Sequence, residues 1–159
     1  MNPEITYVPE FKIVGMSSKM KHGEMHKIID LWKRFRPSQH EITNNVSYHV
    51  LALQVFPKNY KTNINKDFEI WAGVQVEDYN EVPEIMNNIT IPSGLYAVFL
   101  HKGMDASNTY QKIMSEWLPN SDYSLDDRPH FQMMGKNYKN GSPDSEEDFY
   151  IPIKPNHKN

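Results

Sequence analysis

The sequence lacks cysteine, long apolar runs and a large net charge, and each absence excludes a class of protein. Without cysteine there are no disulfides and no thiolate chemistry. No stretch approaches the roughly 20 apolar residues of a membrane span, and the start, Met1 to Glu4, lacks the pattern of a signal peptide. A net charge of -3 gives no basic field for nucleic acid. We therefore expect a cytoplasmic protein that binds neither nucleic acid nor membranes directly.

Aromatic residues, by contrast, are plentiful. They make up 12% of the chain, and the nine Tyr are matched by nine Met. A length of 159 residues is enough for one domain with a real core, or for two small units that share one. So many aromatic and thioether side chains exceed what a minimal core requires, which indicates a further role for some of them.

Two segments have the apolar spacing of a helix that lies on a sheet. The first stripe is Met25, Ile28, Ile29, Trp32 and Phe35, and Pro37 is expected to end it; the second is Tyr110, Ile113, Met114, Trp117 and Leu118, followed by Pro119. A constant offset of 85 residues relates the stripes and also sets residues 11–15 against 96–100. Residues 67–70 echo 148–151 at an offset of 81. This self-similarity predicts a tandem repeat.

Strand-like segments fill the rest of each repeat. They are rich in β-branched and aromatic residues and cover 46–56, 68–76, 131–134 and 149–153. The predicted fold is α+β, a tandem duplication of a β-α-β-β unit with two helices on antiparallel sheets and a ligand cleft between the repeats. We expect a single domain over residues 1–159, with repeat 1 at about 8–80 and repeat 2 at about 90–154. The acidic, Asn- and Gly-containing run 137–147 is expected to be an exposed loop.

Strand alternation separates a core face from a second face that is unusual. In residues 67–77 one face is wholly apolar, while the other carries Glu69 and Trp71. In the last strand Asp148 and Tyr150 lie opposite the core residues, and the strand around Tyr96 is apolar on both faces. Either a ligand cleft or direct packing of the two repeats as dry core would cover this second face.

Several strings resemble the GyrI-like family of effector-binding domains, which occur in AraC-type and related multidrug-sensing regulators. The strings are Ile91-Pro-Ser-Gly-Leu-Tyr-Ala-Val-Phe99, His101-Lys-Gly103, Ser115-Glu-Trp-Leu-Pro-Asn-Ser121 and Phe149-Tyr-Ile-Pro-Ile-Lys154. The resemblance implies a duplicated β-α-β-β fold whose cleft binds bulky aromatic, often cationic compounds without a metal or organic cofactor. Some relatives carry a helix-turn-helix domain, for which we expect no room here because the first strand is predicted to begin by about residue 10.

The chain departs from the family pattern at one pocket position. Many members have a Glu in an aromatic-Glu-x-Tyr setting, whereas the matching stretch here places Gln132 at the acid and Met134 at the Tyr. Gln can donate and accept hydrogen bonds but carries no charge. Glu69 or Asp148 could compensate for the missing carboxylate. The loss also weakens the case for a hydrolase, which needs a buried carboxylate as general base.

The predicted function is the binding of small amphipathic, aromatic and possibly cationic molecules by a sensor or sequestering protein, for which no enzyme activity is required. Two alternatives stay open: a protein-interaction module, such as a gyrase-inhibitor-like partner, and a hydrolase of reactive xenobiotics. No catalytic site is predicted. No metal site is predicted either, because His22 and His26 have a helical spacing but no third ligand. The predicted ligand-binding residues are Tyr48, Glu69, Trp71, Tyr96, Trp117, Gln132, Met134, Asp148 and Tyr150.

Overall fold

The computed structural model describes residues 2–58, 60, 65–139 and 142–156, which form nine strands and two helices. The strands are β1 (Glu4–Val8), β2 (Phe11–Met20), β3 (Val50–Val55), β4 (Phe68–Val76), β5 (Asn87–Ile91), β6 (Gly94–Lys102), β7 (Tyr123–Leu125), β8 (His130–Met134) and β9 (Glu146–Pro155). The helices are α1 (Met25–Ser38), with the 3-10 turn η1 (Gln39–Glu41) after it, and α2 (Ala106–Lys112), which continues as the π-helical turn η3 (Ile113–Trp117). Within the described residues, no helix is both long enough and apolar enough to cross a membrane.

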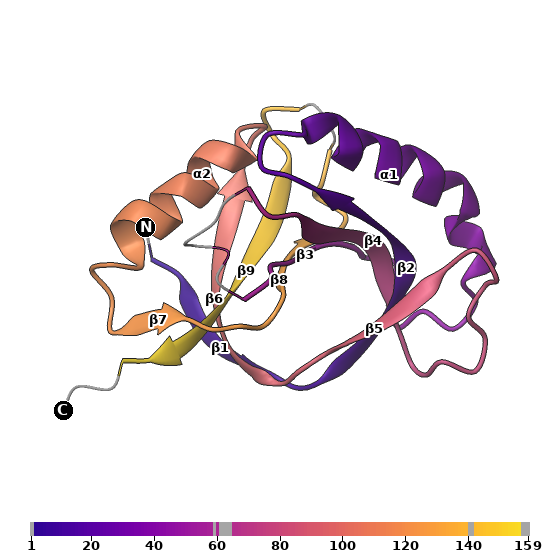
Figure 1. Cartoon of the computed structure of the whole chain (residues 1–159), viewed down its shortest axis with the longest axis horizontal. Coiled ribbons are helices and arrows are strands. Elements are labelled where there is room, and N and C mark those ends of the chain that lie inside the picture. Colours follow the sequence, from indigo (N-terminus) through magenta and orange to yellow (C-terminus); the bar gives the residue numbers. More distant parts are fainter. Residues whose placement is uncertain (1, 59, 61–64, 140–141, 157–159) are drawn as a thin grey trace.

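The strands form an antiparallel sheet in the order β1-β6-β9-β8-β3-β4-β2-β5, and β7 pairs with β9. The order β2-α1-β3-β4 recurs as β6-α2-β8-β9, and the two halves join where β3 pairs with β8. Both helices lie on one side of the central strands, at the top of Figure 1. The α+β fold with two helices on antiparallel strands is therefore confirmed.

Each repeat begins with an extra strand that the sequence did not predict. β1 pairs with β6 and β5 pairs with β2, so the segments β1–β2 and β5–β6 run together as one long antiparallel ribbon. This ribbon crosses below the central strands in Figure 1. Its register continues unchanged from Glu4↔Val98 to Gly15↔Asn87. Pro9 and Pro92 interrupt the two strands at matching points, because proline has no N–H for the ladder.

The ribbon also fixes the true relation between the repeats. The paired segments run from Glu4 to Gly15 and from Asn87 to Val98, so a two-fold exchange of the segments maps Glu4 onto Asn87 and Pro9 onto Pro92, 83 residues apart. The offset of 85 expected for the first strands is therefore wrong by two residues. The duplication itself was visible, but insertions and deletions in the helices and loops hid its register.

The helix stripe of repeat 1 also needs correction. Leu31 (1% exposed) and Phe35 are buried, whereas Met25 (52%) and Ile29 (55%) face solvent. Ile28, Leu31, Trp32 and Phe35 have an equally good helical spacing, and this is the stripe that meets the sheet. Pro37 does not stop α1, since it lies inside the last turn. The stripe of repeat 2 is confirmed, because Ile113 is buried and its four partners pack on the same core.

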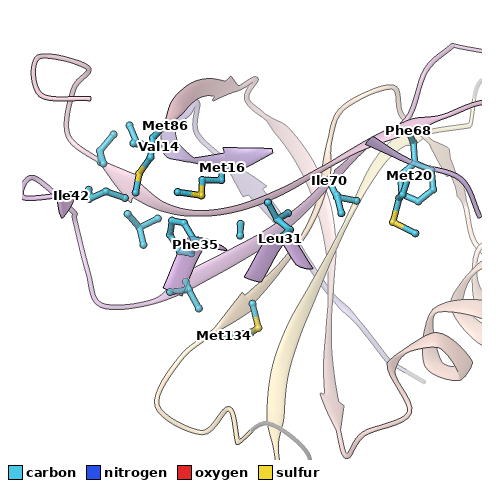
Figure 2. Close-up of a cluster of buried hydrophobic side chains, with 14 residues drawn as sticks. Val14, Met16, Met20, Leu31, Phe35, Ile42, Phe68, Ile70, Met86 and Met134 are labelled. Carbon is cyan, nitrogen blue, oxygen red and sulfur yellow. The ribbon is translucent and has the colours of Figure 1, made fainter. Parts of the chain in front are cut away.

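Three apolar clusters divide the molecule. On the helix side, α1 covers a cluster from β2 and β4 (Figure 2), and α2 covers a second from β6 and β9. The third cluster lies between the central strands and the ribbon, on what we call the ribbon side of the sheet. Near the first of these clusters β2 and β4 approach closely at Gly15 and Gly73, where a Cβ on Gly15 would collide with the Ala72 carbonyl oxygen.

Candidate functional site

The structure does not bring the nine predicted ligand-binding residues together. Alternation along the strands puts two of them on the helix side, five on the ribbon side, and leaves Tyr48 and Trp117 near the ends of α1 and α2. The helix-side pair is Gln132 and Met134, and the ribbon-side set is Glu69, Trp71, Tyr96, Asp148 and Tyr150. The family resemblance and the strand-face argument had therefore pointed to opposite faces of one sheet. The nine residues therefore do not form one cluster, and the ligand-binding role of each stays a prediction.

On the ribbon side the predicted aromatic residues are packed as core. Trp71 is 5% exposed and donates a hydrogen bond from Nε1 to Glu69, and Tyr96 is fully buried, its hydroxyl donating to the Pro129 carbonyl over 2.9 Å. The rings of Phe131 and Tyr150 stack with centroids 4.4 Å apart. The ribbon closes over this cluster, so dry packing, the second possibility left open by the sequence, describes this face.

Arg128 strengthens the same core from its edge. Its guanidinium lies 4.6 Å from the centroid of the Tyr96 ring, pairs with Asp126 at 2.8 Å, and donates to the carbonyls of Leu95 and Ile153. Burial raises the pKa of Tyr96 to about 12. Arg128 Nε and Nη2 are thus satisfied, whereas its Nη1 is buried without a hydrogen-bond partner among the described residues.

On the helix side, the middle of the sheet is less completely covered. Ala52 and Gln132 oppose each other where β3 meets β8, between the strands that carry α1 and those that carry α2, and both remain half-buried. Gln54 and Gln132 form a reciprocal pair: the Gln54 amide nitrogen donates to Gln132 Oε1 at 3.0 Å, and the Gln132 amide nitrogen donates to Gln54 Oε1 at 3.1 Å. This amide pair is the floor of what we call the central site.

Aromatic side chains stand beside this floor. His130 precedes Gln132 by two residues on the same face of β8. Its ring is 5.0 Å from that of Phe56, and its Nδ1 is hydrogen-bonded to the Tyr110 hydroxyl at 3.1 Å. Phe56 in turn contacts Tyr60, with ring centroids 4.9 Å apart. Burial, and to a lesser degree the nearby Tyr60 phenol, raise the pKa of Tyr110, so its hydroxyl stays protonated at neutral pH.

Glu147 supplies the charged group of the central site. It shares the helix-side alternation of Phe149 and Ile151, and burial raises the pKa of its carboxyl to about 7. Among the described residues, none forms an ion pair with this carboxylate or donates a hydrogen bond to it. The Tyr138 side chain is close enough that burial and the Glu147 charge raise its pKa, while Arg36 lowers it.

Two of the hollows on the described surface each contain one predicted residue. One, of about 380 Å³, is lined by Arg36, Gln39, His40, Ile42, Asn45, Tyr48 and Val74. The other, of about 260 Å³, is lined by Glu116, Trp117, Asn120 and Ser121. Neither is lined by Gln132 or Glu147. They lie at the ends of the helices and lack the combination of a carboxylate and several aromatic rings that the central site has.

The chain is similar to known proteins over almost its whole length. Residues 4–153 match the family model Cass2, described as integron-associated effector binding protein. The chain belongs to this family. The fold and the match confirm the predicted GyrI-like effector-binding domain, which binds small molecules as its family does.

Individual relatives agree with the family. This Cass2-family domain is 31% identical over 160 residues to the transcriptional regulator BrlR of Pseudomonas aeruginosa; the alignment covers 96% of this chain and 56% of BrlR. Among solved structures, SAV2435 bound to tetraphenylphosphonium superposes with a TM-score of 0.73 at 16% identity, covering 97% of this chain and 94% of that one. The integron cassette protein VCH_CASS2 of Vibrio cholerae gives 0.65 at 17% identity and 96% coverage of both chains. At these identities the two structures establish the shared fold alone.

A candidate site residue that the sequence analysis missed is Glu147. The run 137–147 was expected to be a loop, but β9 already begins at Glu146. A signal was available, since the core alternation Phe149, Ile151, Ile153 extends backwards by one step to Glu147. A single acid on the core side of a strand contradicts that pattern and therefore marks a candidate site.

The raised pKa of Glu147 predicts a pH-dependent stability in this Cass2-family domain. The folded value of about 7 exceeds the ordinary 4.5, so the folded state holds its proton more tightly and loses stability as pH rises from about 4.5 to 7. Glu147→Gln removes that loss. After allowance for solvent screening we expect a gain of about 1 kcal/mol, or about 3 °C in Tm, at pH 8 and almost none at pH 5. Thermal unfolding at the two pH values checks this, and equal shifts at both would contradict the burial of Glu147.

Proposed function

We propose that the central site binds small aromatic cations and that the Glu147 carboxylate is their counter-charge. The observation that carries the proposal is a half-buried carboxylate that no described cation neutralises, placed on the same face as several aromatic rings. A charge in such surroundings costs free energy unless a partner pairs with it. A cationic ligand would be that partner.

The aromatic groups suit the rest of such a ligand. Phe56, Tyr60 and Tyr110 present ring faces or edges near the floor, and Tyr138 lies beside the acid. Aromatic faces attract cations through their quadrupole and stack on aromatic ligands, each contact contributing about 0.5–2 kcal/mol. A carboxylate on the same face as these rings therefore favours lipophilic aromatic cations over simple ions or amines.

The comparisons support the same class of ligand. SAV2435, which shares this fold, is bound to tetraphenylphosphonium, an aromatic cation without hydrogen-bonding groups. We infer that the domain serves as a cytoplasmic sensor or sequestering module for such molecules. The regulator BrlR has 44% of its length outside the match, so the wider role of BrlR is not transferred with the site.

Calorimetric titration of the protein with tetraphenylphosphonium at pH 6 and pH 8 tests the proposal. The ligand does not titrate, so a change in affinity reports on the protein. With the Glu147 pKa at about 7, about one tenth of the carboxyl is ionised at pH 6 and about nine tenths at pH 8. We expect the affinity to rise roughly tenfold across this interval. Saturable binding without that pH dependence would remove Glu147 from the site, and no binding at either pH would overturn the proposed function.

A further inference from the structure

The floor of the central site is a reciprocally hydrogen-bonded pair of amides, and this arrangement limits which ligand groups can cover it. Gln54 and Gln132 each donate one N–H to the other and accept one in return, at 3.0 and 3.1 Å. The pair also fixes its own orientation. Turning one amide alone would place N against N and O against O, so the two side chains hold each other in place.

Half of the hydrogen-bonding capacity of the pair remains unused by this contact. A primary amide has two N–H donors and a carbonyl oxygen with two lone pairs, and the reciprocal pair uses one donor and one lone pair of each. Both side chains are half-buried, so water can reach the remaining groups. A ligand that covers the floor displaces that water, and an apolar group would then leave buried polar atoms without partners.

The floor is within reach of the acid. Gln132 lies opposite Phe149 across β8 and β9, and Glu147 is two residues from Phe149 on the same face. Such diagonal neighbours in an antiparallel pair are about 7–8 Å apart. One substituted aromatic ring spans that separation, with its positive charge towards Glu147 and a substituent over the amides.

We propose that the Gln54–Gln132 pair selects, among aromatic cations, those that carry a planar hydrogen-bonding group such as a carboxamide. The inference rests on the proposed function and adds a hydrogen-bonding group to the aromatic cation. A carboxamide can accept from a free Gln N–H and donate to a free Gln carbonyl lone pair, which replaces the displaced water. Glu147 contributes charge, and the amide pair contributes discrimination between ligands of equal charge.

Two matched pyridinium ions test this directly. The 1-benzyl-3-carbamoylpyridinium ion has the carboxamide, and the 1-benzyl-3-ethylpyridinium ion has an apolar group of similar size on the same cationic ring. By calorimetry at pH 8 we expect the wild-type protein to bind the carboxamide about fivefold more tightly, the value of roughly one net hydrogen bond. Equal or reversed affinities would overturn the inference.

The double variant Gln54→Met, Gln132→Met provides the second arm. Replacing both partners of a hydrogen-bonded pair by apolar groups of similar shape is nearly neutral for folding, whereas either single change would leave the other amide unsatisfied. We expect the double variant to lose the fivefold preference, so that the two ions bind with equal affinity. A preference that persists would place the carboxamide elsewhere and overturn the inference.

The outcomes also separate this inference from the proposed function. If both pyridinium ions bind equally and Glu147→Gln weakens both, only the role of the amide pair is wrong. If neither ion binds wild type, the cation site itself is wrong and the inference is overturned with it.

Discussion

Glu147→Gln is expected to bind tetraphenylphosphonium about 30-fold more weakly than wild type at pH 8, with no change in affinity between pH 6 and pH 8. Removing one partner of a buried charge pair costs about 2–5 kcal/mol. Glu147 is only half-buried, so the lower end, about 2 kcal/mol or about 30-fold, applies here. The pH dependence should vanish with it, because the group whose pKa is about 7 has been removed. Calorimetric titration of the variant at the two pH values measures both effects.

Glu146→Gln is the matched control for this variant. Glu146 is adjacent to Glu147 in β9 and is also half-buried, so its replacement by Gln removes the same charge. Strand alternation turns the Glu146 side chain to the opposite face of the sheet. We expect it to leave both the affinity and the pH dependence within about twofold of wild type, an effect of the size expected for a solvent-screened charge. Similar losses in the two variants would mean that net charge, rather than a site at Glu147, attracts the cation.

The apolar periodicity of the sequence predicted some helices and strands correctly and missed others. The stripe from Tyr110 to Leu118 and the alternation in 68–76 gave two of the main elements correctly, because each has one buried face with a single period. β1 and β5 were missed because they are short edge strands that bury few of their side chains. Met25 and Ile29 were misplaced because α1 carries apolar residues on more than one face, and periodicity alone cannot choose among them.

The site was harder to predict for a related reason. Strand alternation predicts which side chains share a face of the sheet, but not which of the two faces another segment covers. The ribbon that closes over Trp71 and Tyr96 depends on β1 and β5 pairing across the repeats, a long-range contact with no local signal. Gln132 was identified by resemblance alone, and its partner Gln54 follows only from the pairing of β3 with β8. An acid out of place in a core pattern, as at Glu147, was the one local clue.

Gln132→Glu is expected to raise the affinity for tetraphenylphosphonium about 20-fold at pH 8. The family resemblance implies an acid at the position of Gln132 in many GyrI-like domains. The Gln132 carbonyl already accepts a hydrogen bond from the Gln54 amide, which a carboxylate would retain. A charge pair about 5 Å apart at an effective dielectric of about 20 gains about 3 kcal/mol. Desolvation of the new carboxylate offsets roughly half of it, which leaves about 1.7 kcal/mol. At pH 6 the gain should shrink, because Glu147 on the diagonal raises the pKa of the new acid.

The control for this gain of affinity is Gln75→Glu, which adds the same charge to β4 on the ribbon side. We expect no more than a twofold change in affinity from it, since it faces away from the central site. The two variants also test the role of the amide pair. Gln132→Glu removes one of the two hydrogen bonds between Gln54 and Gln132, whereas Gln75→Glu leaves both in place. If the floor acts as argued, Gln132→Glu binds tetraphenylphosphonium better and reduces the preference for the carboxamide-bearing pyridinium. A gain in one without a loss in the other would show that charge and amide recognition occur at separate places in the fold.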